Sequence, residues 1–215
     1  MNRRQKIIII LGLGAFIVVA LIVRHEEAGY IALLKGDYNT AVREFSLKVR
    51  QGDSMSTYFT GFLYDTPGFR MVNKNKAAHA YLKSAKLGSV DGAIHYLYLV
   101  STLKDRHLNC SVLVKLFYDA ASTHILSAIF LNFKFFSNGK CTKKDRFEAA
   151  QYFKWAGEIS GPIRGSFEDY YVSMSKSEQK EFNSRTFKKP HRISANRFLN
   201  IFFSKLHEVT PINFG

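Results

Sequence analysis

Histidines, cysteines and paired acids are the residues that would carry catalysis or bind a metal in this chain. The histidines are scattered at positions 25, 79, 95, 107, 124, 191 and 207, and none belongs to an HExxH motif or a Cys/His cluster with metal-ligand spacing. The acid pairs, Glu26 with Glu27 and Glu168 with Asp169, fit solvated surfaces better than acid/base chemistry. No GxSxG sequence marks a nucleophile. We therefore expect a protein that is not an enzyme and that uses neither a cofactor nor a metal.

The elements that position these residues follow a register of 36 residues. Its four columns are Ala41, Ala77, Leu113 and Ala149; Phe45, Tyr81, Phe117 and Phe153; Val49, Ala85, Ala121 and Gly157; and Gly52, Gly88, His124 and Ser160. A repeat of this length is typical of paired short helices, whose apolar faces are buried only when one copy stacks on the next. The pattern predicts an all-α array of antiparallel helix pairs. Such an array offers a binding surface more readily than a reaction centre.

Helix-like spacing and stop signals divide the array into four pairs. The first lies within 26–52, and the others combine 54–65 with 75–87, 90–103 with 111–123, and 125–136 with 144–158. Beyond residue 160 the register fades, with weaker helices at 166–174 and 177–183. The amphipathic stretch 194–206, which follows Pro190, is expected to form a capping helix; an apolar and basic face on a membrane is the alternative.

The two cysteines, Cys110 and Cys141, fall near equivalent loops of neighbouring repeats and so on one edge of the stack. This placement is compatible with one disulfide in an exported domain, and equally with two unrelated buried thiols. Metal binding is not expected, because no further Cys or His accompanies them at metal-ligand spacing.

The N-terminal segment, residues 1–24, reads as a membrane anchor. Arg3, Arg4 and Lys6 precede the run 7–23, which contains no ionisable residue and as a helix would span about 25 Å, near the minimum for crossing a bilayer. The basic flank favours a cytoplasmic N-terminus and a periplasmic array, single-pass in a bacterial inner membrane. A cleaved signal peptide, which would leave a soluble periplasmic protein, is the alternative.

Basic residues dominate the chain, which carries a formal net charge of +14, and they gather in the C-terminal part, 176–215. Lys188, Lys189, Arg192 and Arg197 are the candidate partner-binding residues there. Such a patch favours an acidic protein partner or anionic lipid, whereas nucleic acid is not expected outside the cytoplasm. The alternative is an ordinary solvated face of a basic protein.

The repeat region, 26–175, resembles Sel1-like repeats, relatives of the tetratricopeptide fold. The best-matching copy has the family pattern at Tyr58, Gly61, Tyr64, Gly68, Val72, Lys76, Ala77, Tyr81, Ala85 and Gly88, and a later copy retains Gly139, Ala149, Phe153, Ala156 and Gly157. Leu97 and Phe133 replace Gly61 in phase, which puts the close helix crossing in doubt there.

The resemblance implies a right-handed superhelix that acts as a non-catalytic adaptor. In such arrays the first helix of each pair lines the concave face, so we expect partner contacts from Tyr58, His95, Tyr98, Asn132 and Lys134. One exported group of the family serves as periplasmic immunity proteins against phospholipase-like toxins of type VI secretion systems. An immunity-type inhibitor of such an effector is therefore the most specific expectation, and a structural adaptor of an envelope or secretion complex is the alternative.

Overall fold

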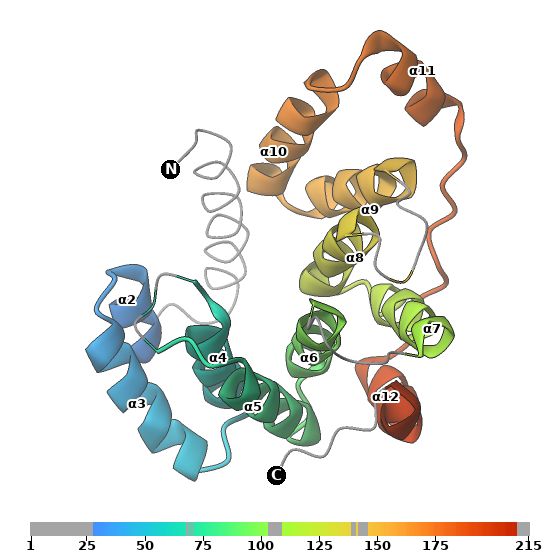
Figure 1. The fold of residues 1–215 in the computed structure, drawn as a ribbon. Coiled ribbons are helices and arrows are strands. Elements are labelled where there is room, and N and C mark those ends of the chain that lie inside the picture. The colour runs from blue at the N-terminus through green and yellow to red at the C-terminus, as the bar shows by residue number, and fades with distance from the viewer. Residues whose placement is uncertain are drawn as a thin grey trace.

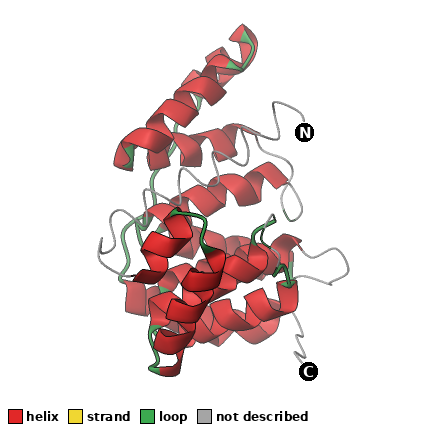
Figure 2. Ribbon diagram, turned by 90° about the vertical axis from the view of Figure 1, so that its left-hand side faces the viewer, coloured by secondary structure: helices red, strands yellow, loops and turns green. Residues whose placement is uncertain are grey.

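The computed structural model describes residues 28–67, 69, 71–102, 109–138, 141 and 146–209. This part of the chain consists of helices and loops without a strand, as Figure 2 shows. The helices are α2 (Ala28–Leu34), α3 (Tyr38–Arg50), α4 (Ser54–Asp65), α5 (Lys74–Lys86), α6 (Val90–Thr102), α7 (Cys110–Ala121), α8 (Leu126–Asn138), α9 (Arg146–Ile159), α10 (Gly161–Val172), α11 (Lys176–Ser184) and α12 (Ala195–Val209). The all-α prediction is confirmed for these residues.

The expected membrane run, residues 7–23, lies outside the described residues. None of the described helices is both long and apolar enough to cross a bilayer.

From α2 to α10, helices that follow one another in the chain pack against one another. α2 contacts α3, α4 contacts α5 and α8 contacts α9, while α6 also touches both α4 and α8. Figure 1 shows the result as an arc with α4, α6 and α8 along its inner side and α5, α7 and α9 outside them. The first helix of each pair thus lies on the inner side, so residues of α4, α6 and α8 share one face.

The 36-residue columns form the core of this arc. Ala41, Ala77, Leu113 and Ala149 have no exposed surface, and the aromatic column, Phe45, Tyr81, Phe117 and Phe153, is at most 2% exposed. The fourth column ends the outer helices: Gly52, Gly88 and His124 have φ values of 80°, 94° and 58°, a left-handed conformation that closes a helix. Ser160 departs from the column with φ −130° because it leads directly into α10.

Gly61 and Gly92 are among the glycines that set how closely the helices approach. A Cβ on Gly61 would lie 2.7 Å from Cδ1 of Tyr81, and one on Gly92 would lie 2.8 Å from the backbone nitrogen of Ala85. On α8 the equivalent of Gly61 is Phe133, whose ring stacks on Phe153 with centroids 4.4 Å apart. The close glycine contact between α4 and α5 is therefore replaced by aromatic stacking between α8 and α9.

The C-terminal segment returns to the middle of the array, where α12 contacts both α6 and α7 (Figure 1). Three backbone acceptors mark its path: Ile193 N donates to Ser122 O at 2.8 Å, His124 Nε2 to Pro190 O at 3.0 Å, and Asn109 N to Val209 O at 3.2 Å. Phe198 and Phe202 of α12 are completely buried.

The position of α12 differs from the expected cap at the end of the array, and it also rules out the membrane-facing alternative. α12 covers the third helix pair instead of the end of the array, because α6 and α7 contact each other over a shorter stretch than the other pairs and leave an apolar surface for it. Its own apolar face is used inside the molecule, so the alternative of a membrane-facing helix is wrong for this structure.

Candidate functional site

Cys110 and Cys141 are joined by a disulfide bond. Cys110 is the first residue of α7, whose N-terminus is capped by the side chain of Asn109, and Cys141 follows α8. The bond closes a loop with a sequence separation of 31 and places the two Cα atoms 5.0 Å apart. It ties the third helix pair to the fourth on one edge of the array.

Four of the five residues expected to touch a partner from the inner helices come together with two carboxylates. We call this group the inner-face cluster; its members are Tyr58 and Asp65 of α4, Tyr81 of α5, Asp91, His95 and Tyr98 of α6, and Lys134 of α8. Three inner helices thus contribute to one site. The fifth expected residue, Asn132, is not part of it.

Tyr58 and Asn132 are buried, with 2% and 0% of their surface exposed, so the expectation that they face a partner is wrong. Asn132 instead joins α8 to α7, because its side-chain amide donates to Phe117 O and to Ala128 O, both at 2.9 Å. Residue spacing alone could not decide whether Asn132 faces the inner side of the array or the neighbouring helix α7.

His95 connects Tyr58 to Asp91 through hydrogen bonds that fix its protonation. His95 Nδ1 lies 3.0 Å from the carbonyl oxygen of Asp91, which can only accept, so Nδ1 carries the proton. In the neutral ring Nε2 is then an acceptor, and the Tyr58 hydroxyl donates to it over 3.2 Å. Burial lowers the pKa of His95, which favours this neutral form.

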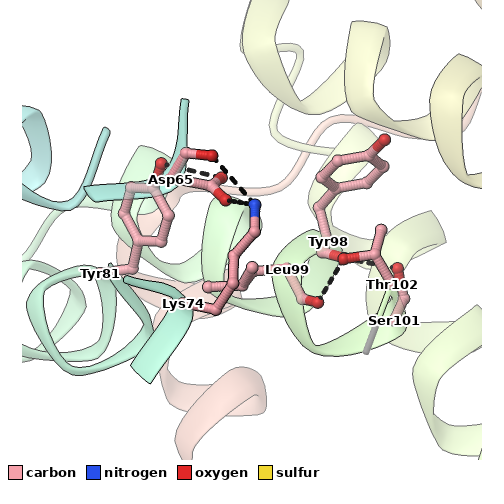
Figure 3. A network of polar contacts seen from close by, with 7 residues as sticks. All are labelled: Asp65, Lys74, Tyr81, Tyr98, Leu99, Ser101 and Thr102. Carbon is pink, nitrogen blue, oxygen red and sulfur yellow. Dashed lines mark hydrogen bonds and ion pairs between the residues drawn. The ribbon is translucent and has the colours of Figure 1, made fainter. Parts of the chain in front are cut away.

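Asp65 anchors the other end of the cluster (Figure 3). Lys74 Nζ donates to the carbonyl oxygen of Asp65 at 2.9 Å and forms an ion pair with its carboxylate, which also accepts from Tyr81 Oη at 3.4 Å. Burial raises the pKa of both Tyr58 and Tyr81 well above the ordinary value, so both hydroxyls stay protonated. The two tyrosines therefore act as hydrogen-bond donors within the core.

Lys134 is the one cationic residue among the five inner-helix residues that were expected to contact a partner, and it lies in the cluster. Its ammonium lies 5.2 Å from the ring centroid of Phe130 and 6.0 Å from that of Tyr98, an aromatic setting suited to a cation. Burial lowers the pKa of Lys134, and the negative charge of Asp65 partly offsets that effect. His95, Tyr98, Phe130 and Lys134 are all only partly buried, so this side of the cluster is accessible.

The C-terminal basic residues do not join the inner-face cluster. Lys188, Lys189 and Arg192 lie on the chain segment between α11 and α12, and Arg197 lies on α12, all on the outer side of the arc (Figure 1). All four are exposed, and Lys189 pairs with Glu158 of α9. The sequence-predicted contact residues that are not buried therefore lie in different parts of the molecule: His95, Tyr98 and Lys134 on the inner helices, and the four basic residues in the C-terminal part.

Comparison with known proteins does not assign the chain to a family. The chain matches no protein-family model, and no curated protein matches it in sequence. The resemblance to Sel1-like repeats therefore depends on the motif residues alone.

Sequence reasoning missed Asp65, Asp91 and Phe130 as members or neighbours of the site. Asp91 lies 36 residues before Ser127, and the Ser127 hydroxyl donates to its carboxylate, so the register itself could have paired them. Among the described residues no group of three or more His, Cys, Asp or Glu side chains could hold a metal ion.

Proposed function

We propose that this chain is a non-catalytic protein-binding scaffold, a Sel1-like superhelical array whose inner face holds a partner protein. The observation that carries the proposal is the partly buried row formed by Tyr98, Phe130 and Lys134, in which the negative charge of Asp65 acts on the lysine. Aromatic side chains held on a rigid surface are among the groups that contribute most to binding energy at protein interfaces, and the charge of Lys134 can pair with an acidic group of a partner.

The bonding of the cluster supports binding over chemistry. Both ring nitrogens of His95 are engaged within the protein, one by Asp91 O and the other by Tyr58 Oη. A general base must offer an available lone pair to its substrate, and this histidine offers none without first breaking an internal hydrogen bond. The cluster is therefore better suited to fixing the shape of the inner face.

In its most specific form, the proposal is an immunity-type inhibitor anchored by residues 7–23, with the array outside the cytoplasmic membrane. Its partner would be a secreted antibacterial effector of the phospholipase-like type VI class, bound so that the array covers the active cleft. The resemblance to Sel1-like immunity proteins and the net charge of +14 support this form.

The test is protection of cells that export a candidate effector of this class, chosen from the genes beside the one that encodes this protein. Wild-type chain should restore growth, and Y98A/K134E should lose protection and bind the purified effector at least about tenfold more weakly, since two contact residues are removed. The matched control, L47A/K83E, changes one apolar residue and one lysine at exposed positions on α3 and α5.

Two results would count against the proposal in different ways. Equal affinity of Y98A/K134E and L47A/K83E for the effector would remove the inner face as the binding surface. Unchanged growth in cells lacking this protein, combined with loss of an envelope or secretion complex, would favour the structural adaptor instead.

A further inference from the structure

A polar hollow lies on the outer side of the array, between α9 on one wall and the end of α11 with the chain that follows it on the other. Its volume is about 210 Å³, and we call it the basic groove. The residues used below are Lys154, Trp155 and Glu158 from α9 and Arg185, Phe187 and Lys189 from the other wall. Only Lys189 of these was expected to contact a partner, because the groove joins segments about 30 residues apart that no spacing rule connects.

Each cation of the groove is held against an aromatic ring. Lys154 Nζ lies 5.9 Å from the ring centroid of Phe182, Arg185 Cζ lies 4.5 Å from that of Phe147, and Lys189 Nζ lies 5.8 Å from that of Trp155. Such contacts restrict the long side chains before a ligand arrives, which lowers the entropy lost on binding.

The charge of the groove remains positive after its internal pairs are considered. Lys189 pairs with Glu158, and Arg185 pairs with Glu181 at 2.8 Å. Lys154 is exposed and adds a third cation to the same walls. Because both ion pairs are exposed and weak, an incoming carboxylate can share these cations at little cost.

The aromatic wall gives the groove a fixed shape. Trp155 is 4% exposed and is surrounded by other rings: His124 contacts it edge-on with centroids 5.0 Å apart, and Phe187 lies 6.1 Å away. Most of the exposed lining is polar, so a lipid acyl chain would find little apolar surface there. The volume is also below the roughly 300 Å³ at which small-molecule pockets begin.

We propose that the basic groove binds an acidic, extended segment of the partner protein, with one or two carboxylates placed among Lys154, Arg185 and Lys189. This inference rests on the proposed function, because it gives the scaffold a second contact and states the chemistry of the partner at that contact. The size and polarity of the groove suit one or two acidic side chains.

The groove contains its own reporter, because Trp155 is the single tryptophan of the chain. The probe is a decaglutamate peptide, titrated into the purified full chain while the tryptophan emission is followed. We expect a saturable change for wild type and at least tenfold weaker binding for K154E/R185E. The control K188E/R192E makes the same change in net charge at exposed positions outside the groove lining, and its affinity should change less than about threefold.

Three outcomes would overturn the inference: no saturable change, equal weakening by both double reversals, or groove-dependent binding of anionic phospholipid vesicles without binding of the peptide. If K154E/R185E loses helicity, K154Q/R185Q takes its place, with at least fivefold weakening expected. Effector binding that depends on Tyr98 and Lys134 but not on the groove would remove this inference alone. Peptide binding in the groove without any protection of cells would instead remove the proposed function alone.

Discussion

Phe202→Ala tests whether α12 is an integral part of the array. Phe202 is completely buried and its ring lies 6.1 Å from that of Tyr96 on α6, so truncation leaves a cavity between two helices. Removing a buried Phe side chain costs about 3–5 kcal/mol, a large share of the 5–15 kcal/mol that stabilises a typical domain. Phe203→Ala, on the same helix at a partly buried position, should cost about 1–2 kcal/mol and is the matched control.

Urea unfolding followed by far-UV circular dichroism measures both losses, since the described chain is helical. Hydrogen exchange locates the effect: α6 and α7, which α12 contacts, should lose protection in the Phe202→Ala variant while α2 and α3 keep theirs. A loss below about 1 kcal/mol, or a loss equal to that of Phe203→Ala, would refute the packing role given to α12.

Three further predictions concern other parts of the array. Gly92→Ala should lower the free energy of unfolding by about 1–3 kcal/mol, measured by heat or urea, because the new Cβ would lie 2.8 Å from Ala85 N. Gly165→Ala, with open space around it, should raise that free energy by up to about 1 kcal/mol. Equal effects of the two substitutions would contradict the close crossing of the helices at Gly92. Replacing Cys110 and Cys141 by Ser should cost about 3–4 kcal/mol for a loop with a separation of 31, and reductant should then have no further effect on unfolding. Burial raises the pKa of Asp119, so the folded chain binds that proton more tightly than the unfolded chain does and the ionised carboxylate destabilises the fold. Asp119→Asn should therefore add up to about 1 kcal/mol at pH 7, a gain that shrinks as the pH falls through that raised pKa; a loss of stability at pH 7 would oppose it.

The fold could be predicted as far as its local periodicity reaches. The 36-residue columns identified the buried stripes, and the fourth column located the left-handed residues Gly52, Gly88 and His124. Both follow from short-range rules, because a helix stripe repeats every three to four residues and a helix is commonly closed by a left-handed residue.

The candidate sites were only partly accessible to the same reasoning. His95, Tyr98 and Lys134 were found because the inner helix of each pair can be recognised from the register, but Tyr58 and Asn132 share those helices and point into the core. The amphipathic pattern of α12 showed that one face must be covered, and nothing local to it indicated that α6 and α7 provide the cover. Long-range returns of this kind depend on surfaces formed by residues about 100 positions apart.

The basic groove was also missed, because it is formed by segments that lie far apart in the sequence. Lys189 was recognised within a run of basic residues, whereas Lys154 belongs to a helix of mixed composition and becomes relevant only when the returning chain lies beside it. Its signal in the sequence was weak, because a lysine beside Trp155 on α9 is an ordinary feature of an exposed helix surface.

Photocrosslinking in the native cell tests the central claim, that the inner face binds a protein partner, most directly. A photoreactive amino acid would replace Tyr98 on the inner side of α6 or, as a control, exposed Lys83 on α5. The account predicts one discrete protein adduct from position 98 and none from position 83. Absence of an adduct at position 98, or the same adducts from both positions, would contradict it.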